Sequence, residues 1–367
     1  MKQTYGRHRF STNLLLSLGF LLIILVGTLL LMLPASSRCG TSCGLMTALF
    51  TATSATCVTG LSLVDVYSQF STLGQVILLC LIQIGGLGFM SVASILIILF
   101  RRRLGMKEQM LIAQSLGTSN MQSIVQMQRW MLRMCFAIES LGAFLLMLRF
   151  LPEYGLKRAL WLGIFHAISA FCNAGFDILG FRAPGASLTT YGTDPFILLP
   201  LSLLIILGGL GYLVWEEVAR VRRWKKLSVY ARLVLLATLS LLAIGTGLIL
   251  ILEWNNPETL GPMTVPQKIL AAFFQSVTLR TAGFSGVSQE ALTDGGKLVS
   301  MTLMLVGGSS GSTAGGLKTV TLLVILLFLK SRMLGHSTVT VFHRSIPMSL
   351  VLNALSIFGL MVSLSFL

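Results

Sequence analysis

Long apolar runs, separated by short polar segments, dominate the pattern of the chain. The clearest runs contain about 20 residues each and cover positions 13–33, 72–100, 195–214 and 233–252. A helix needs about 20 consecutive apolar residues to cross the roughly 30 Å hydrocarbon layer of a bilayer. The runs therefore predict membrane-spanning helices. The first run follows Lys2, Arg7 and Arg9 but exceeds the 7–15 apolar residues of a signal peptide, so we expect a retained helix.

Three shorter segments between the long runs align with one another, at positions 50–61, 165–176 and 274–284. Each opens with Phe, passes through small and hydroxyl residues, and ends in Gly followed by a large apolar residue. About a dozen residues cannot cross the bilayer as a helix. Irregular backbone at membrane depth survives only where it is buried in protein or lines a wet cavity. We therefore expect re-entrant half-helices that lead into the strands of a filter.

The runs that follow these segments also resemble one another. Residues 83–90 match residues 206–213, whereas the third copy agrees at 305–308 and then departs. We therefore expect ordinary second helices in the first two repeats and a special one in the third.

The expected fold is an all-α polytopic membrane protein, in which helix–pore loop–helix repeats surround a central cation pathway. Three complete repeats and the start of a fourth are expected at 1–104, 105–228, 229–335 and 336–367.

The composition supports lipid as the main solvent of the chain. Hydrophobic residues make up 54% and charged residues 11% of the sequence, and the mean hydropathy is +0.86. Soluble domains carry roughly 25% charged residues.

The net charge of +15 lies on one side of the predicted membrane. The N-terminus and the segments 101–133, 216–232 and 330–344 together hold 18 Lys and Arg against 3 Asp and Glu. The positive-inside rule makes this side, and the N-terminus, cytoplasmic. Membrane topology thus explains the placement of the charge, and the charge does not indicate a protein that binds nucleic acid. The clusters at 101–103 and 220–226 either only set topology or also bind anionic lipid or a cytoplasmic partner.

The residues at the predicted filter suit a cation pore. They carry no carboxylate, so backbone carbonyls would replace the hydration shell of the ion. They are Val58, Thr59, Gly60, Asn173, Ala174, Gly175, Thr281, Ala282 and Gly283. Acids on the outer side either raise the local cation concentration or are simply solvated; among them are Asp65, Asp177, Glu253, Glu258 and Glu290.

A glycine-rich segment interrupts the second helix of the third repeat. Its residues are Gly307, Gly308, Ser309, Ser310, Gly311, Ser312, Thr313, Ala314, Gly315, Gly316 and Lys318. A nucleotide-binding P-loop is excluded because Leu317 separates the last Gly from Lys318. Two interpretations of the segment remain: a structural kink, or a gate below the filter. Lys318 would either bond a nearby acid or carbonyl, or repel the ion in a closed state.

Several isolated polar residues have structural interpretations. Arg280 is expected behind the filter, where it supports the filter by bonding pore-loop carbonyls, since an unpaired Arg there would be costly. His166 is expected to pack or hydrogen-bond, and Glu139 to find a local partner. A disulfide between Cys39 and Cys43 is left open. Because we find no nucleophile–base pair and no metal-ligand spacing, we do not expect an enzyme.

The segments 57–61, 173–177 and 275–284 resemble the Trk/Ktr/HKT superfamily of potassium transporters, and the third is most similar to the Ktr-type membrane subunit. The resemblance implies four pore-loop repeats around one pathway, with the filter glycines at Gly60, Gly175 and Gly283. In this superfamily, glycine at the first filter position goes with potassium and serine with sodium, so Gly60 indicates potassium. The resemblance also supports a mobile gate loop in the third repeat.

The same resemblance implies further properties. They are a place in the bacterial cytoplasmic membrane, a homodimer, a separate cytoplasmic nucleotide-binding regulatory subunit of the KTN/RCK type, and no covalent cofactor. Potassium is the expected transported ion, and a role for sodium is left open. The chain shows no fourth pore segment, since 349–367 reads as the start of a seventh spanning helix, so we expect a truncated sequence. A secondary transporter of a small solute, whose helices are also broken, is the alternative.

Overall fold

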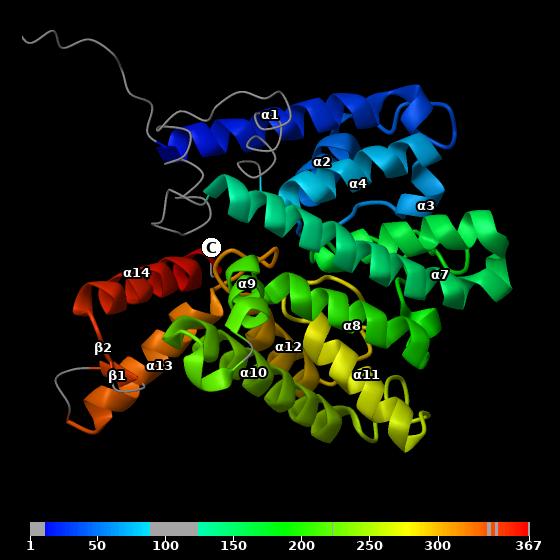
Figure 1. Ribbon diagram of the computed structural model, residues 1–367. Helices are drawn as coiled ribbons and strands as arrows, with labels where there is room; N and C mark the ends of the chain where they lie inside the picture. Colours follow the sequence, from blue (N-terminus) through cyan, green and yellow to red (C-terminus); the bar gives the residue numbers. More distant parts are fainter. Residues whose placement is uncertain (1–11, 89–123, 222, 336–338, 342–343, 366–367) are drawn as a thin grey trace, which may run out of the picture.

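The computed structural model describes residues 12–88, 124–221, 223–335, 339–341 and 344–365. Helices that run in similar directions form most of the molecule (Figure 1). The second half of the run at 72–100 and the basic cluster at 101–103 lie outside the described residues.

The first unit contains a long helix, a short buried helix and a second long helix. Helix α1 covers Thr12–Met32, α2 covers Leu45–Cys57, and α4 covers Thr72–Leu87, with the one-turn helix α3 at Val66–Gln69 before α4. Helix α2 has 13 residues and spans about 20 Å at 1.5 Å per residue, so it is a half-helix. It packs against both long helices, as the spacing of the apolar runs predicts.

The second unit repeats this order with one difference. Helix α7, Ile124–Phe171, is divided at Gly155, where the backbone is non-helical, and its second part is the half-helix. Helices α8, Pro195–Leu210, and α9, Tyr212–Val221, meet at an angle of 95° at Gly211. The expectation of an ordinary second helix in this repeat is therefore wrong. Gly211 has a φ of 83°, which a helix cannot continue through.

The third unit follows with α10, Val229–Glu253, and the half-helix α11, Val265–Thr278. Its second helix is split into α12, Asp294–Leu305, and α13, Thr319–Met333, with the glycine-rich segment between them. The remaining described elements are the antiparallel strands β1, Val339–Val341, and β2, Arg344–Ile346, and the helix α14, Met348–Ser365. Short 3-10 turns lie at Pro34–Ser36, Thr189–Tyr191 and Trp224–Lys226.

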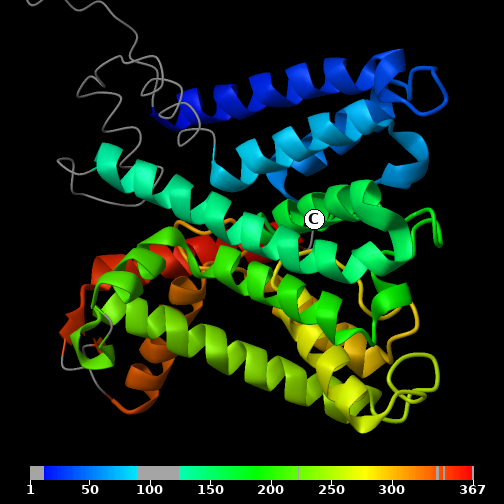
Figure 2. The ribbon, with the colours of Figure 1, turned by 45° about the vertical axis from the view of Figure 1, so that its right-hand side comes forward.

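Among the described residues, two helices are long and apolar enough to span a membrane alone, Gln128–Phe171 and Val229–Glu253. The bent pair of α8 and α9 passes the same test when both helices are counted together. Helix α7 lies between α4 and α8 in both ribbon views (Figures 1 and 2).

The side chains are distributed as in a membrane protein. Large apolar side chains point outward, for example Leu29, which is 67% exposed, and Ile251, which is 76% exposed. The half-helix α2 instead buries small residues, with Ala48, Ala52 and Ala55 fully covered. Small residues let helix backbones approach closely inside a bilayer. This packing brings the ends of the three half-helices to the centre of the molecule.

Candidate functional site: three convergent pore loops

Each half-helix ends in the same unusual backbone conformation. The residue concerned lies one to three positions after the helix end and has a positive φ. These residues are Val58, Asn173 and Thr281, with φ values of 56°, 57° and 63°. Non-glycine residues rarely adopt this left-handed region, and β-branched Val and Thr are clear outliers there. Two residues later stand Gly60, Gly175 and Gly283, again at positive φ. The repeated pattern in the sequence therefore encodes a repeated backbone turn.

The three glycines converge on one point. A Cβ atom at Gly60 would lie 2.6 Å from the carbonyl oxygen of Ala174, and one at Gly175 would lie 2.6 Å from that of Ala282. A Cβ at Gly283 would lie 3.0 Å from the Cα of Gly175. Gly60 thus contacts the second loop, Gly175 and Gly283 contact each other, and a side chain at Gly60 or Gly175 would collide with the neighbouring loop. The structure brings these three predicted residues together.

Hydroxyl groups of the half-helices hold the loops from behind. The side chain of Ser169 donates a hydrogen bond to the carbonyl of Phe176 at 2.7 Å, and that of Thr278 donates to the carbonyl of Phe284 at 2.7 Å. In the first loop, Thr59 donates to the hydroxyl of Ser54 at 2.8 Å. Sequence reasoning missed these anchors. A hydroxyl residue five or six positions before each glycine was the available signal.

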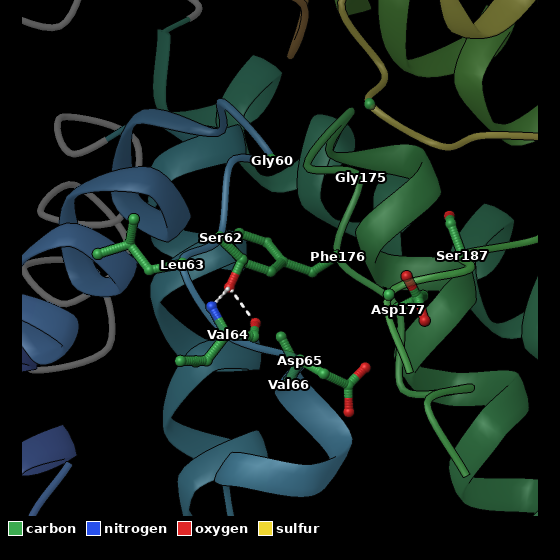
Figure 3. A pocket seen from close by; sticks show the side chains of 12 residues that line it. Gly60, Ser62, Leu63, Val64, Asp65, Val66, Gly175, Phe176, Asp177 and Ser187 are labelled. Atoms are coloured by element: carbon green, nitrogen blue, oxygen red, sulfur yellow. Dashed lines mark hydrogen bonds between the residues drawn. The ribbon is translucent and has the colours of Figure 1, made fainter. Parts of the chain in front are cut away.

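One cavity of about 350 Å³ lies on the side of the glycines that carries the loops 62–66 and 176–187 (Figure 3). Asp65 and Asp177 line it from these two different loops. Asp177 accepts hydrogen bonds from the amide of Leu179, at 3.0 Å, and from the hydroxyl of Ser187. Burial, and secondarily the charge of Asp65, raises the pKa of Asp177 to about 6. The cavity is therefore negatively charged at neutral pH.

A second cavity of about 440 Å³ lies between the first and the third loop. Val58, Thr59 and Thr281 line it together with Gly315 and Gly316 of the glycine-rich segment. The predicted filter residues thus face cavities that differ in chemistry, one bounded by acids and one by the glycine-rich segment.

The glycine-rich segment forms a closed loop within the membrane region. Its two ends pair as a short parallel bridge, with the amide of Gly307 donating to Leu317 and the amide of Leu317 donating to Leu305, both at 3.0 Å. Close to the second end of the segment, the amide of Gly315 donates to the hydroxyl of Thr281 at 3.1 Å. The loop therefore touches the third filter loop directly.

The tip of this loop docks on the break between α8 and α9. The amides of Ser309 and Thr313 donate to the carbonyls of Gly209 and Gly208, at 3.0 and 3.2 Å. The hydroxyl of Thr313 reaches the carbonyl of Phe171 at 2.9 Å, at the end of the second half-helix. The bonds to Gly208 and Gly209 satisfy carbonyls that the bent helix leaves free.

Two tyrosines contact the same tip. The amide of Tyr212 donates to the carbonyl of Gly311 at 3.2 Å, and the ring of Tyr212 covers Gly311. The hydroxyl of Tyr230, at the start of α10, donates to the carbonyl of Ser310 at 3.1 Å. The loop tip is therefore held by the second repeat and by the first turn of α10.

Arg280 and Lys318 both bond this loop. Arg280 is 4% exposed, and its guanidinium donates to the carbonyl of Gly307 at 3.3 Å. The expected bond to a pore-loop carbonyl is thus corrected to one with the glycine-rich loop, because that loop brings the carbonyl of Gly307 within reach of the guanidinium. Lys318 donates to the carbonyl of Ala314 at 2.8 Å, which agrees with the simpler of its two interpretations.

The other isolated residues have local partners. Glu139 accepts from the amide of Gln83 at 2.9 Å, across the contact between α4 and α7. Nδ1 of His166 lies 2.8 Å from the carbonyl of Leu162, in an aromatic environment. Cys39 and Cys43 are not bonded to each other in the structure. Among the described residues, no group of three or more His, Cys, Asp or Glu could hold a metal ion.

A family model described as "TrkH: Cation transport protein" matches residues 13–367. The chain belongs to this family. It is 37% identical over 358 residues to the "Potassium/sodium uptake protein NtpJ" of Enterococcus hirae, covering 98% of this chain and 78% of that protein. It is 38% identical over 349 residues to the "Ktr system potassium uptake protein B" of Bacillus subtilis, covering 95% and 77%.

The fold agrees with that of a solved member of the family. The crystal structure of the potassium transporter TrkH from Vibrio parahaemolyticus matches with a TM-score of 0.68 at 18% identity, over 97% of this chain and 71% of that one. The predicted class, an all-α membrane protein of pore-loop repeats, and the predicted family are therefore confirmed.

Proposed function

We propose that this chain takes up potassium ions across a membrane through the site formed by Gly60, Gly175 and Gly283. One observation carries the proposal: the three glycines meet between an acid-lined cavity and a cavity bounded by an intramembrane loop. Backbone carbonyls of the residues before each glycine would replace the hydration shell of the ion. The printed names of the relatives in Enterococcus hirae and Bacillus subtilis support potassium as the substrate.

The glycine-rich loop acts as the gate of this pathway. It lies against Thr281 of the third filter loop and is held by a limited set of hydrogen bonds at its tip. Each such bond contributes about 0.5–1.5 kcal/mol, so the bonds together favour the docked loop by several kcal/mol, and the loop opens when other contacts or water replace them. Lys318 and Arg280 bond carbonyls of the loop and stabilise the closed position.

The wider setting follows the resemblance to the superfamily. The chain lies in the bacterial cytoplasmic membrane with its basic segments inside, forms a homodimer, and works with a nucleotide-binding regulatory subunit of the KTN/RCK type. Sodium takes part in transport, as the name of NtpJ indicates for that relative. Catalysis is not part of this function. A solute carrier with broken helices fits less well, because such folds place half-helices around a midplane pocket rather than three pore loops around a common point.

Growth of a bacterium that lacks its own potassium uptake systems provides the test. We expect this chain, expressed by itself or fused to the C-terminal part of the Bacillus subtilis relative, to restore growth at low external potassium. Shortening the loop between Gly308 and Gly315 should then raise the initial rate of uptake. If neither form restores growth although both reach the membrane, the proposed function is wrong.

A further inference from the structure

A cluster of exposed cations lies between α9 and α10. We call Arg220 and residues 223–226 the basic turn. Arg220, Arg223, Lys225 and Lys226 are all exposed, at the end of α9 and in the following 3-10 turn. Neither the filter nor the glycine-rich loop uses these side chains.

The position of the basic turn relative to the membrane is fixed by α10. Ser228 caps this helix by accepting a hydrogen bond from the amide of Ala231, and the apolar span begins at Val229. Lys226 thus stands three residues before the span. At about 1.5–3.5 Å per residue, its backbone lies within roughly 10 Å of the hydrocarbon boundary, which is the depth of lipid headgroups.

The described part of the chain offers these cations no acidic partner. The ion pairs found there join Arg149 or Arg182 to Glu153 or Asp194, near the break of α7 at Gly155. Glu217 is the nearest acid along the chain on this side, and both of its carboxylate oxygens bind the amide and the hydroxyl of Ser228. Four exposed cations thus stand against Glu216 and Glu217 of α9, and the basic turn presents net positive charge at headgroup depth.

An aromatic side chain stands among the cations. Trp224 is 49% exposed and lies between Arg223 and Lys225 in the chain. Leu227 directly after the turn is buried and packs with Val214 and Ala231, which holds the turn on the ends of α9 and α10. Trp is enriched at the membrane interface, where its ring is half in apolar and half in polar surroundings.

We propose that the basic turn is a binding site for the headgroups of anionic phospholipids, with Trp224 at the interface. Clustered Lys and Arg beside a membrane span attract anionic lipid strongly, and each charge adds to the effect. The charge, the depth and the exposed indole together favour a lipid over an acidic protein as the occupant.

The same turn connects the two tyrosines that hold the glycine-rich loop. Tyr212 begins α9 and Tyr230 lies in the first turn of α10, on either side of the basic turn. Lipid bound there fixes both helices and favours the docked loop, a consequence that rests on the gate proposed above. The binding itself does not depend on transport.

Native mass spectrometry of the whole chain with added lipid tests the binding. The variant K225Q/K226Q should bind phosphatidylglycerol at least about tenfold more weakly than the parent chain, because two charges are lost. The matched control is K330Q/R332Q, which removes two cations from the end of α13 on the same side. It should change binding less than about twofold, because the basic turn keeps all of its charges in this variant.

A second variant separates charge from folding. K225R/K226R keeps both charges and should bind phosphatidylglycerol like the parent, while phosphatidylcholine should bind weakly to every variant. Undiminished phosphatidylglycerol binding by K225Q/K226Q, or an equal loss in K330Q/R332Q, would overturn the proposal and leave an acidic protein as the better occupant. If a variant loses potassium uptake while it binds phosphatidylglycerol like the parent, the result counts against the proposed gate and not against the lipid site.

Discussion

At the scale of single residues, the turns that follow the half-helices, where we propose the filter, have a strained backbone. Val58 and Thr281 are β-branched residues at φ values of 56° and 63°. Such positions cost on the order of 1–3 kcal/mol each and persist only where the surrounding structure determines them. The hydroxyl of Thr278 supplies part of that constraint by bonding the carbonyl of Phe284 after Thr281, and Ser54 does so by accepting a bond from Thr59 next to Val58. The strain thus lies where the ion would lose its water.

Adding one methyl group at the filter tests this arrangement. In Gly175→Ala the new Cβ would lie 2.6 Å from the carbonyl oxygen of Ala282, so the loops must separate. We expect potassium uptake to fall to background while the protein still reaches the membrane. Gly247→Ala in α10 is the control, because nothing lies within 4 Å of its Cβ and uptake should be unchanged. Normal uptake by Gly175→Ala would exclude this point as the pathway.

The acid-lined cavity predicts a dependence on external pH. The pKa of Asp177 is raised to about 6, so its carboxylate is charged above this pH and neutral below it. As external pH falls through about 6, the cavity loses negative charge and attracts cations less strongly. The KM for potassium should therefore rise.

Asp177→Asn should remove this pH dependence and raise the KM at pH 7.5 by roughly twofold or more, because the focused potential in the cavity weakens. Glu258→Gln, at an exposed outer position, is the control and should keep the pH profile of the parent. Initial rates of uptake at a series of potassium concentrations measure both. A pH profile of Asp177→Asn identical to that of the parent would show that Asp65 or another acid dominates the cavity.

At the scale of elements, the bent helix of the second repeat and the glycine-rich loop of the third form one assembly. Glycine at position 211 is needed for the bend of the helix and for the contact with the loop. It takes the positive φ of the bend, and a Cβ there would lie 2.9 Å from the hydroxyl of Ser309. The break at Gly211 exposes carbonyls that the loop then satisfies. Each irregular segment therefore depends on the other.

Removing one hydroxyl tests whether this assembly keeps the gate closed. Tyr230→Phe loses the bond to the carbonyl of Ser310 and the hydroxyl contacts with Ser309 and Ser310, all at the loop tip. A bond of this kind contributes about 0.5–1.5 kcal/mol, so the open population should rise roughly two- to tenfold. We expect a higher maximal rate of uptake.

The control lies on the same helix. Thr246→Ala removes a hydroxyl bond to the carbonyl of Leu242 within α10 and does not touch the loop, so its uptake should match the parent. A lower rate for Tyr230→Phe would show that the contact supports the open state instead.

At the scale of the whole molecule, polar contacts at two different depths join the first and second units. On one side, Arg158 donates to the hydroxyl of Tyr67 and lies 3.8 Å from the centre of the Phe181 ring, which links the first and second units. Deeper in the membrane region, Gln83 of α4 bonds Glu139 of α7. A carboxylate that is 3% exposed needs such a partner.

The pair of Gln83 and Glu139 predicts a clear stability effect. Gln83→Leu leaves the buried carboxylate without its donor, which should lower the free energy of unfolding by about 1–3 kcal/mol. In a Glu139→Leu background the same change should cost much less, because no carboxylate remains. Thermal unfolding of the purified chain in detergent gives the four values of this cycle. Equal effects in both backgrounds would show that the two side chains are not coupled.

The sequence alone determined the features that depend on local composition and on periodicity. Apolar runs of spanning length, half-helices of about a dozen residues, and glycine at the end of each half-helix follow from the chemistry of neighbouring residues, and the family confirms this architecture. The residue pattern also located Gly60, Gly175 and Gly283 before their convergence could be seen.

Only the tertiary structure decided how distant segments meet. The hydroxyl of Thr313 bonds the carbonyl of Phe171, 142 positions away, and Arg280 bonds Gly307 instead of a pore loop. The bend at Gly211 was also missed, although the matching Gly88 ends α4 at a φ of 81° and the shared glycine was a local sign of the break. These contacts are made by backbone carbonyls, which every residue carries. The sequence therefore cannot specify them, and the packing of the repeats selects which carbonyls remain free.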